Sequence, residues 1–146
     1  MSPAKSPTQP TTQLPRNQFL TGDAIEVAKS LPDACIDTVV TSPPYYKQRD
    51  YDSDLQIGQE KSPEAYVQRL KDLFTELHRV VKPSGAAWVV IGDKYVKGEL
   101  MGMPWRVCFA IKDAGWILRS DCIWHKPNAM PSALSLIHIS EPTRPY

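Results

Sequence analysis

Apolar residues recur along the chain in two alternating patterns, short continuous runs and helical stripes. Residues 36–40 and 86–91 are largely apolar runs of strand length, and 116–124 is a third stretch that predicts a strand. Residues 62–81 predict a longer helix, opened by Ser62-Pro63 and ended by Pro83-Ser84-Gly85. Its apolar stripe has i, i+3, i+4 spacing and should lie on a sheet: Tyr66, Leu70, Leu73, Phe74 and Leu77.

Shorter signals complete the order of elements. Residues 18–21 predict a brief strand, and Asp23 is placed to cap a short helix over 24–31. A further helix is predicted over 104–114, and the polar stretch 46–61 predicts a long loop. Strands and helices alternate, which predicts an α/β fold with a mostly parallel sheet and helices on both faces.

The composition is that of a globular domain without marked charge. Of the 146 residues, 42% are hydrophobic and 23% are charged. No apolar run approaches the roughly twenty residues of a membrane span, and the net charge of +1 argues neither for nor against nucleic acid. Cys35, Cys108 and Cys122 are widely spaced, and there is no secretory signal peptide. This predicts free, mostly buried thiols and a cytoplasmic location.

The candidate chemistry lies directly after the first long strand, at Ser42-Pro43-Pro44-Tyr45-Tyr46. The two prolines remove two backbone N–H donors. Hydrogen-bond partners for the carbonyls and the Ser42 hydroxyl must therefore come from outside this turn. Open α/β sheets bind their ligands at the carboxyl ends of strands. A turn with hydrogen-bond acceptors beside an aromatic ring in that position is suited to bind an amino group.

This motif resembles the catalytic Ser/Asp/Asn-Pro-Pro-Tyr/Phe/Trp motif of the amino-group DNA methyltransferases. The resemblance implies a partial Rossmann-like sheet of the kind that uses S-adenosyl-L-methionine. It also implies a permuted layout, in which the catalytic motif precedes the cofactor motif. Neighbouring segments strengthen the resemblance: Gly22-Asp23-Ala24, Val80-Val81-Lys82-Pro83-Ser84-Gly85, Ile91-Gly92-Asp93-Lys94, Pro104-Trp105-Arg106 and Trp124-His125-Lys126-Pro127-Asn128.

The resemblance implies direct methyl transfer, without a metal, from S-adenosyl-L-methionine to an exocyclic amine of a base flipped out of double-stranded DNA. The catalytic residues would be Ser42, Pro43, Pro44 and Tyr45. The Ser42 hydroxyl and the Pro43 carbonyl would accept the two N–H bonds of the amine, and Tyr45 would stack on the base. Serine at the first motif position favours cytosine N4 over adenine N6. A cognate restriction endonuclease is a candidate partner.

Cytosine C5 methylation does not fit the cysteines of this chain. That reaction needs a thiolate nucleophile, and in the family that performs it the cysteine follows a proline. Here Cys35, Cys108 and Cys122 follow alanine, valine and aspartate.

Further residues are candidates for binding the cofactor and DNA. Asp23 and Asp93 could accept from adenosine amino or ribose hydroxyl groups. The alternative is that Asp23 only caps a helix and Asp93 only forms a turn. Trp105 and Trp124 are expected to pack in the core. DNA contacts are assigned to the residues after the motif and to the loop beside the target base: Tyr46, Lys47, Arg49, Lys126 and Asn128.

Three segments are expected along the chain. Residues 1–17 have little to bury and should form a mobile arm, and residues 18–133 are interpreted as the catalytic half of a truncated methyltransferase domain. Residues 134–146 are interpreted as a non-native tail, because this segment resembles a translated sequencing adapter. The chain has no Asp-Pro-Phe-x-Gly-x-Gly cofactor motif. On its own it is therefore expected to have little or no activity.

Two other functions fit part of the motif. Protein-glutamine methyltransferases have a similar motif with asparagine first, but their cofactor motif precedes it, and the required glycines are missing between Phe19 and Ser42. Pro43-Pro44-Tyr45-Tyr46 also fits the Pro-Pro-x-Tyr ligand of WW domains, which would make the chain a non-catalytic interaction segment. Such ligands lie in exposed, disordered tracts, whereas this one ends a predicted strand.

Overall fold

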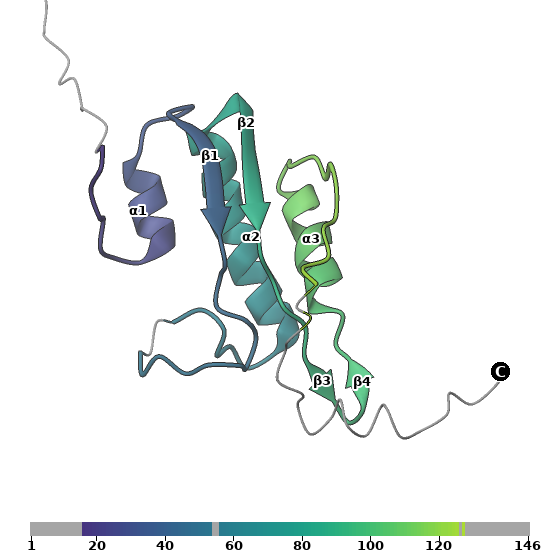
Figure 1. Ribbon diagram of the computed structural model, residues 1–146. Coiled ribbons are helices and arrows are strands. Elements are labelled where there is room, and N and C mark those ends of the chain that lie inside the picture. The colour runs from purple at the N-terminus through teal and green to yellow at the C-terminus, as the bar shows by residue number, and fades with distance from the viewer. Residues whose placement is uncertain (1–15, 54–55, 126, 128–146) are drawn as a thin grey trace, which may run out of the picture.

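The computed structural model describes residues 16–53, 56–125 and 127 (Figure 1). The predictions of three helices, of strands at 36–40 and 86–91, and of an irregular segment after the motif are confirmed within these residues. In chain order the elements are α1 (Ala24–Ser30), β1 (Ile36–Thr41), α2 (Pro63–Val80), β2 (Val81–Val89), β3 (Tyr95–Val96), β4 (Glu99–Leu100) and α3 (Met103–Asp113).

Local capping fixes where the first two helices begin. Asp23 Oδ1 accepts from the backbone N–H of Ile25 at 2.9 Å and from that of Glu26 at 3.3 Å. Ser62 Oγ accepts from the Ala65 N–H at 3.2 Å, which caps α2. Both side chains satisfy N–H groups that have no partner inside the helix. Four residues of the predicted stripe are buried on α2, namely Tyr66, Leu70, Leu73 and Phe74. Leu77 is only half-buried, and Val80 is buried in addition.

Strands β1 and β2 are parallel neighbours, and their carboxyl ends meet at one edge of the sheet. Thr41 pairs with Val89, and the Val90 N–H donates to the Thr41 carbonyl at 2.9 Å. Helix α2 lies behind the two strands, between α1 and α3 (Figure 1). The α/β class with a parallel sheet is confirmed. The register brings residues 42–46 next to residues 90–93.

Some finer predictions are wrong for the described residues. Residues 18–21 and 116–124 form no strand, because neither has a neighbouring strand to pair its backbone groups. Helices cover one face of the β1–β2 pair, and the described residues form no second layer. On the other face the paired Val40 and Trp88 are 74% and 60% exposed.

The segment predicted to end the helix, Pro83-Ser84-Gly85, belongs to β2, and α2 already ends at Val80. Gly85 permits this arrangement. A Cβ at Gly85 would lie 2.6 Å from the Asp37 carbonyl oxygen, so only glycine allows β1 and β2 to approach so closely here.

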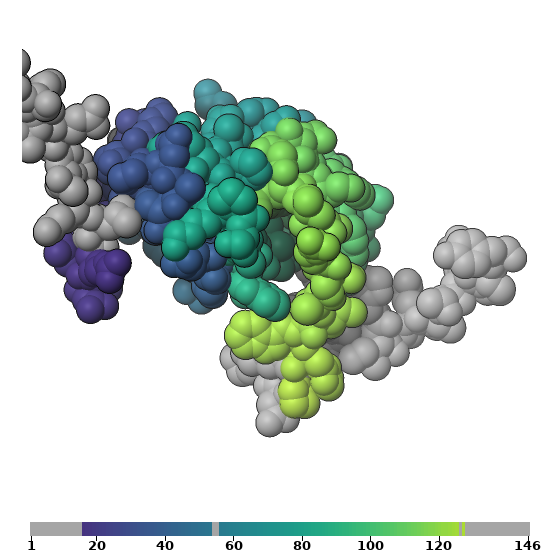
Figure 2. Space-filling model, turned by 90° about the horizontal axis from the view of Figure 1, so that it is seen from above, coloured from purple at the N-terminus to yellow at the C-terminus, as the bar shows by residue number. Residues whose placement is uncertain are grey.

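The core differs from the one expected. Trp105 and Trp124 are 59% and 78% exposed, and no cysteine is fully buried, because the described residues supply no surface to cover these side chains. Figure 2 shows the segment after α3 on the outside of the molecule.

No helix within the described ranges is long and apolar enough to cross a membrane. A buried cluster lies between residues 42–46, α2 and α3: Tyr46, Tyr66, Leu70, Met103 and Val107.

Candidate active site

The Ser42–Tyr46 turn (residues 42–46) directly follows β1 at the carboxyl edge of the sheet. Ser42 is exposed, Pro43 and Tyr46 are buried, and Pro44 and Tyr45 are half-buried. The Ser42 hydroxyl donates to the Tyr45 hydroxyl at 3.2 Å. A serine hydroxyl has one donor and two acceptor positions. With its proton directed at Tyr45, the oxygen of Ser42 can still accept hydrogen bonds from a ligand.

Contacts from α2 and from the loop after the motif hold this turn. The Tyr66 hydroxyl donates to the Pro44 carbonyl at 3.0 Å, and the Lys47 N–H donates to the Gly58 carbonyl at 2.7 Å. Burial raises the pKa of Tyr66 well above its ordinary value, and the nearby Glu60 carboxylate raises it further. The Tyr66 hydroxyl therefore stays protonated and remains a donor.

Gly92 provides the surface against which the Tyr45 ring packs. A Cβ at Gly92 would lie 2.9 Å from Tyr45 Cε2 and 3.0 Å from Cδ2, closer than real Cβ contacts. Neither Gly92 nor Tyr66 was predicted as a site residue: Gly92 was named only within the segment Ile91-Gly92-Asp93-Lys94, and Tyr66 only in the apolar stripe of the helix. The available signals were a glycine just after a strand and a residue with a polar hydroxyl, a tyrosine, within an otherwise apolar helix stripe.

Asp93 caps a helix that is distant in the sequence. Its Oδ1 accepts from the N–H groups of Lys94 at 2.8 Å and Met103 at 3.1 Å, and its Oδ2 accepts from the Gly102 N–H at 3.0 Å. Gly102, the residue that precedes α3, offers no side chain for this purpose. The structure therefore gives Asp93 a role at the N-terminus of α3 that satisfies otherwise unpaired donors.

Asp93→Ala is expected to lower the free energy of unfolding by about 1 kcal/mol in the absence of any ligand, because the α3 donors lose their acceptor. Urea unfolding followed by circular dichroism measures this change. Asp113→Ala is the matched control, because it removes an exposed acid from the other end of α3 whose ion pair with Lys71 spans 3.9 Å. An exposed pair of this kind contributes little, so the variant should cost much less stability than Asp93→Ala. Equal stability of Asp93→Ala and the wild type would contradict the capping role.

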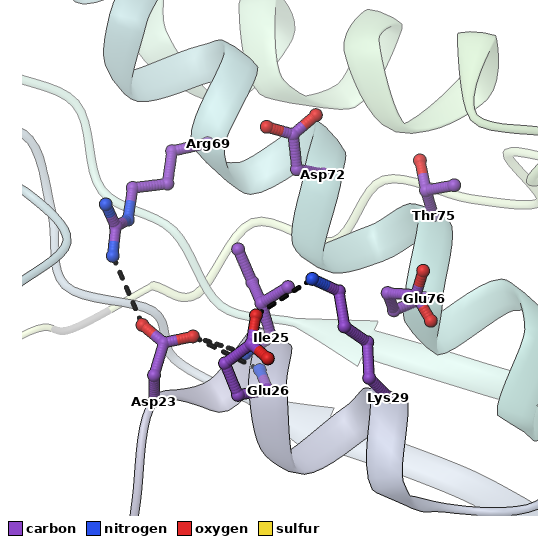
Figure 3. A pocket seen from close by; sticks show the side chains of 8 residues that line it. All are labelled: Asp23, Ile25, Glu26, Lys29, Arg69, Asp72, Thr75 and Glu76. Carbon is purple, nitrogen blue, oxygen red and sulfur yellow. Dashed lines mark hydrogen bonds and ion pairs between the residues drawn. The ribbon is translucent and has the colours of Figure 1, made fainter.

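Asp23 is likewise engaged at a helix start, and its Oδ2 also lies 3.2 Å from an Arg69 guanidinium nitrogen. It lines an open pocket of about 590 Å³ between α1 and α2 (Figure 3), which contains no residue of the Ser42–Tyr46 turn. Cofactor binding by Asp23 and Asp93 stays a prediction. The pocket is lined by charges of both signs: Asp23, Ile25, Glu26, Lys29, Arg69, Asp72, Thr75 and Glu76.

The residues assigned to DNA occupy different environments. Lys47 Nζ donates to the Gln59 carbonyl at 2.8 Å, so this cation is directed at the loop. Arg49 is exposed, and Tyr46 is only 8% exposed because its ring packs 5.5 Å from that of Tyr66. The burial of Tyr46 does not support a direct contact with DNA. Lys126 and Asn128 lie outside the described residues.

Comparison with known proteins shows which family this chain belongs to. A sequence profile of the family described as DNA methylase, of the N6 and N4 amino-methyltransferase type, matches residues 36–142. The chain belongs to the DNA methylase family. The matched range includes residues 134–142, which the sequence analysis assigned to a non-native tail, and that assignment stays a prediction.

Relatives of this DNA methylase chain include Type II methyltransferases of restriction-modification systems. M.Cfr9I of Citrobacter freundii is 38% identical over 86% of this chain and 50% of its own length. M.SfiI of Streptomyces fimbriatus is 41% identical over 77% of this chain and 31% of its own length. The chain therefore spans half or less of these two relatives.

Solved structures share the fold of this DNA methylase chain. The cytosine-N4-specific PvuII DNA methyltransferase superposes with a TM-score of 0.63 and 27% identity, over 80% of this chain and 41% of its own. A putative DNA modification methylase of Thermus thermophilus, solved in complex with S-adenosyl-L-methionine, gives a TM-score of 0.54 and 25% identity. That superposition covers 76% of this chain and 48% of the Thermus protein. The fold is that of part of an S-adenosyl-L-methionine-dependent methyltransferase.

Proposed function

We propose that the chain is the catalytic part of a DNA methyltransferase that acts on an exocyclic amine of a flipped-out base in double-stranded DNA, with cytosine N4 favoured over adenine N6. The observation that carries the proposal is the Ser42–Tyr46 turn at the carboxyl edge of β1. It combines an exposed Ser42 hydroxyl with a Pro43 carbonyl that receives no hydrogen bond from the described residues. The Type II relatives and the cytosine-N4-specific PvuII enzyme support the choice of substrate.

The chemistry requires two acceptors because the lone pair of an exocyclic amine is delocalised into the base. The Ser42 oxygen and the Pro43 carbonyl would each accept one N–H bond. This favours a pyramidal nitrogen with its lone pair available for attack, and the gain is largest in the transition state. Tyr45 would stack on the extruded base.

The proposed methyl donor is S-adenosyl-L-methionine, which supplies its methyl group from a sulfonium. The two residues predicted to bind it, Asp23 and Asp93, have their carboxylates engaged at helix starts in this structure. We propose that its main binding site is formed by other parts of the protein, since the curated relatives are at least about twice as long as the matched segment.

The two alternative functions receive less support. Tyr46 is the tyrosine that a Pro-Pro-x-Tyr ligand would present to a WW domain, and it is 8% exposed within the buried cluster. A protein-glutamine substrate is disfavoured by the relatives, which are Type II methyltransferases. A cognate restriction endonuclease remains a proposed partner on the same grounds.

The test begins with the complete reading frame, read from the source DNA across codon 133 to its stop codon. The protein is expressed in a host without DNA methyltransferases, and the host DNA is digested to nucleosides for mass spectrometry. N4-methylcytosine is expected, with DNA from an empty-vector strain as the control. N6-methyladenine alone would overturn the choice of base. Unmodified DNA would overturn the proposed function, and methylated protein glutamine would replace it.

Tyr45→Ala is expected to raise the activation free energy that corresponds to kcat/KM for duplex DNA by about 1 to 3 kcal/mol, because stacking on the base is lost. Gly92→Ala should lower kcat/KM about tenfold, because its new methyl group displaces the Tyr45 ring. Steady-state methyl transfer to a duplex oligonucleotide measures both changes.

A double-mutant cycle is the control for this pair. In the Tyr45→Ala background the methyl group of Gly92→Ala has no ring to displace, so the double variant should match Tyr45→Ala alone. Additive losses would mean that Gly92 acts by a route other than Tyr45.

A further inference from the structure

Tyr66 joins the core of the protein to the Ser42–Tyr46 turn. Its side chain is fully buried on α2, with 0% exposure, yet its hydroxyl reaches the Pro44 carbonyl at 3.0 Å. A phenylalanine would place the same ring in this space but could not donate a hydrogen bond. The oxygen of Tyr66 therefore has a specific partner in the turn.

Pro43 and Pro44 have no N–H groups, so the carbonyls of the turn need hydrogen-bond donors from other segments of the chain. Among the described residues, only the Tyr66 hydroxyl donates to the Pro44 carbonyl, and nothing donates to the Pro43 carbonyl. The Tyr45 carbonyl accepts a hydrogen bond from the Gln48 N–H at 3.3 Å. Of the two proline carbonyls, one is thus occupied by Tyr66 and the other is left for a ligand.

The Tyr66 ring is held firmly enough to define the position of its hydroxyl. It packs against Tyr46 with ring centroids 5.5 Å apart, and it belongs to the buried cluster with Met103 and Val107. On its other side the turn meets Gly58, where a Cβ would lie 3.1 Å from the Tyr45 carbonyl oxygen. The turn is therefore enclosed between α2 and the following loop.

We propose that Tyr66 is a positioning residue for methyl transfer: by binding the Pro44 carbonyl it fixes the turn so that the Ser42 hydroxyl and the Pro43 carbonyl face the amine. This inference rests on the proposed function. Because Tyr66 is fully buried beneath the turn, it acts through Pro44 and does not touch the substrate.

The test uses the protein from the complete reading frame and the variant Tyr66→Phe, which keeps the ring and removes only the hydroxyl. The variant should lower kcat for DNA methylation about five- to tenfold, the equivalent of one lost hydrogen bond, with little change in KM. Thr75→Val is the matched control, because it removes a hydroxyl on α2 that donates to the Lys71 carbonyl at 2.9 Å. Its kcat should stay within about twofold of the wild type.

A second readout does not depend on activity. The Lys47 and Gln48 amides are hydrogen-bonded to Gly58 and Tyr45, and in Tyr66→Phe their hydrogen exchange should be about five- to tenfold faster. Amides at the end of α3 should not change. Wild-type kcat in Tyr66→Phe, or unchanged exchange of both turn amides, would overturn the positioning role. Absence of DNA methylation by the wild type would overturn the proposed function, while exchange would still decide whether Tyr66 fixes the turn.

Discussion

Ser42→Ala is expected to lower kcat for DNA methylation about 100- to 1,000-fold, the usual effect of removing one preorganised group that stabilises a transition state. The variant loses the oxygen that would accept an N–H bond of the target amine. Its free energy of unfolding should hardly change, because Ser42 is exposed and its side chain bonds only to the Tyr45 hydroxyl among the described residues. Transfer of labelled methyl groups to duplex DNA, with the protein from the complete reading frame, measures the effect.

Two further variants sharpen this experiment. Ser30→Ala removes an exposed hydroxyl at the end of α1, where it donates to the Val27 carbonyl at 2.7 Å, and should leave kcat unchanged. Ser42→Asn keeps an acceptor oxygen at the first motif position and should lose less activity than Ser42→Ala. Full activity of Ser42→Ala would show that the amine is bound elsewhere.

The features that the sequence predicted correctly depend on residues close together in the chain. Asp23 and Ser62 cap helices whose N–H groups lie two or three residues further on. The position of the motif at the carboxyl end of β1 followed from the apolar run directly before it. These parts of the fold and of the site are local, so a single sequence contains the necessary information.

The features that were missed depend on residues far apart in the chain. Tyr66 reaches Pro44 across 22 residues, and Asp93 caps α3 from 9 or 10 residues away. Trp124 was expected in the core, but burial depends on a partner surface that the described residues do not supply. For the same reason 116–124 lacks the neighbouring strand that its pattern required.

Phe74→Ala is expected to lower the free energy of unfolding by about 3 to 5 kcal/mol, because it opens a cavity in the packed face of α2. Phe74 is fully buried, and its ring lies edge-on to that of Trp116, with centroids 6.2 Å apart. A typical domain has about 5 to 15 kcal/mol of stability, so this one change would remove much of it. Urea unfolding followed by circular dichroism measures the loss.

Comparison of variants at Phe74 and its neighbour separates cavity formation from effects on the helix itself. Phe74→Leu keeps most of the buried volume and should cost less than Phe74→Ala. Thr75→Ala changes an exposed residue of the same helix turn and should alter stability by no more than about 0.5 kcal/mol. A loss below about 1 kcal/mol for Phe74→Ala, against the usual cost of a buried phenylalanine, would mean that α2 does not pack through this face. Phe74 and Tyr66 lie on the same face of α2. If that face does not pack, the proposed link from α2 through Tyr66 to the Ser42–Tyr46 turn would no longer be supported.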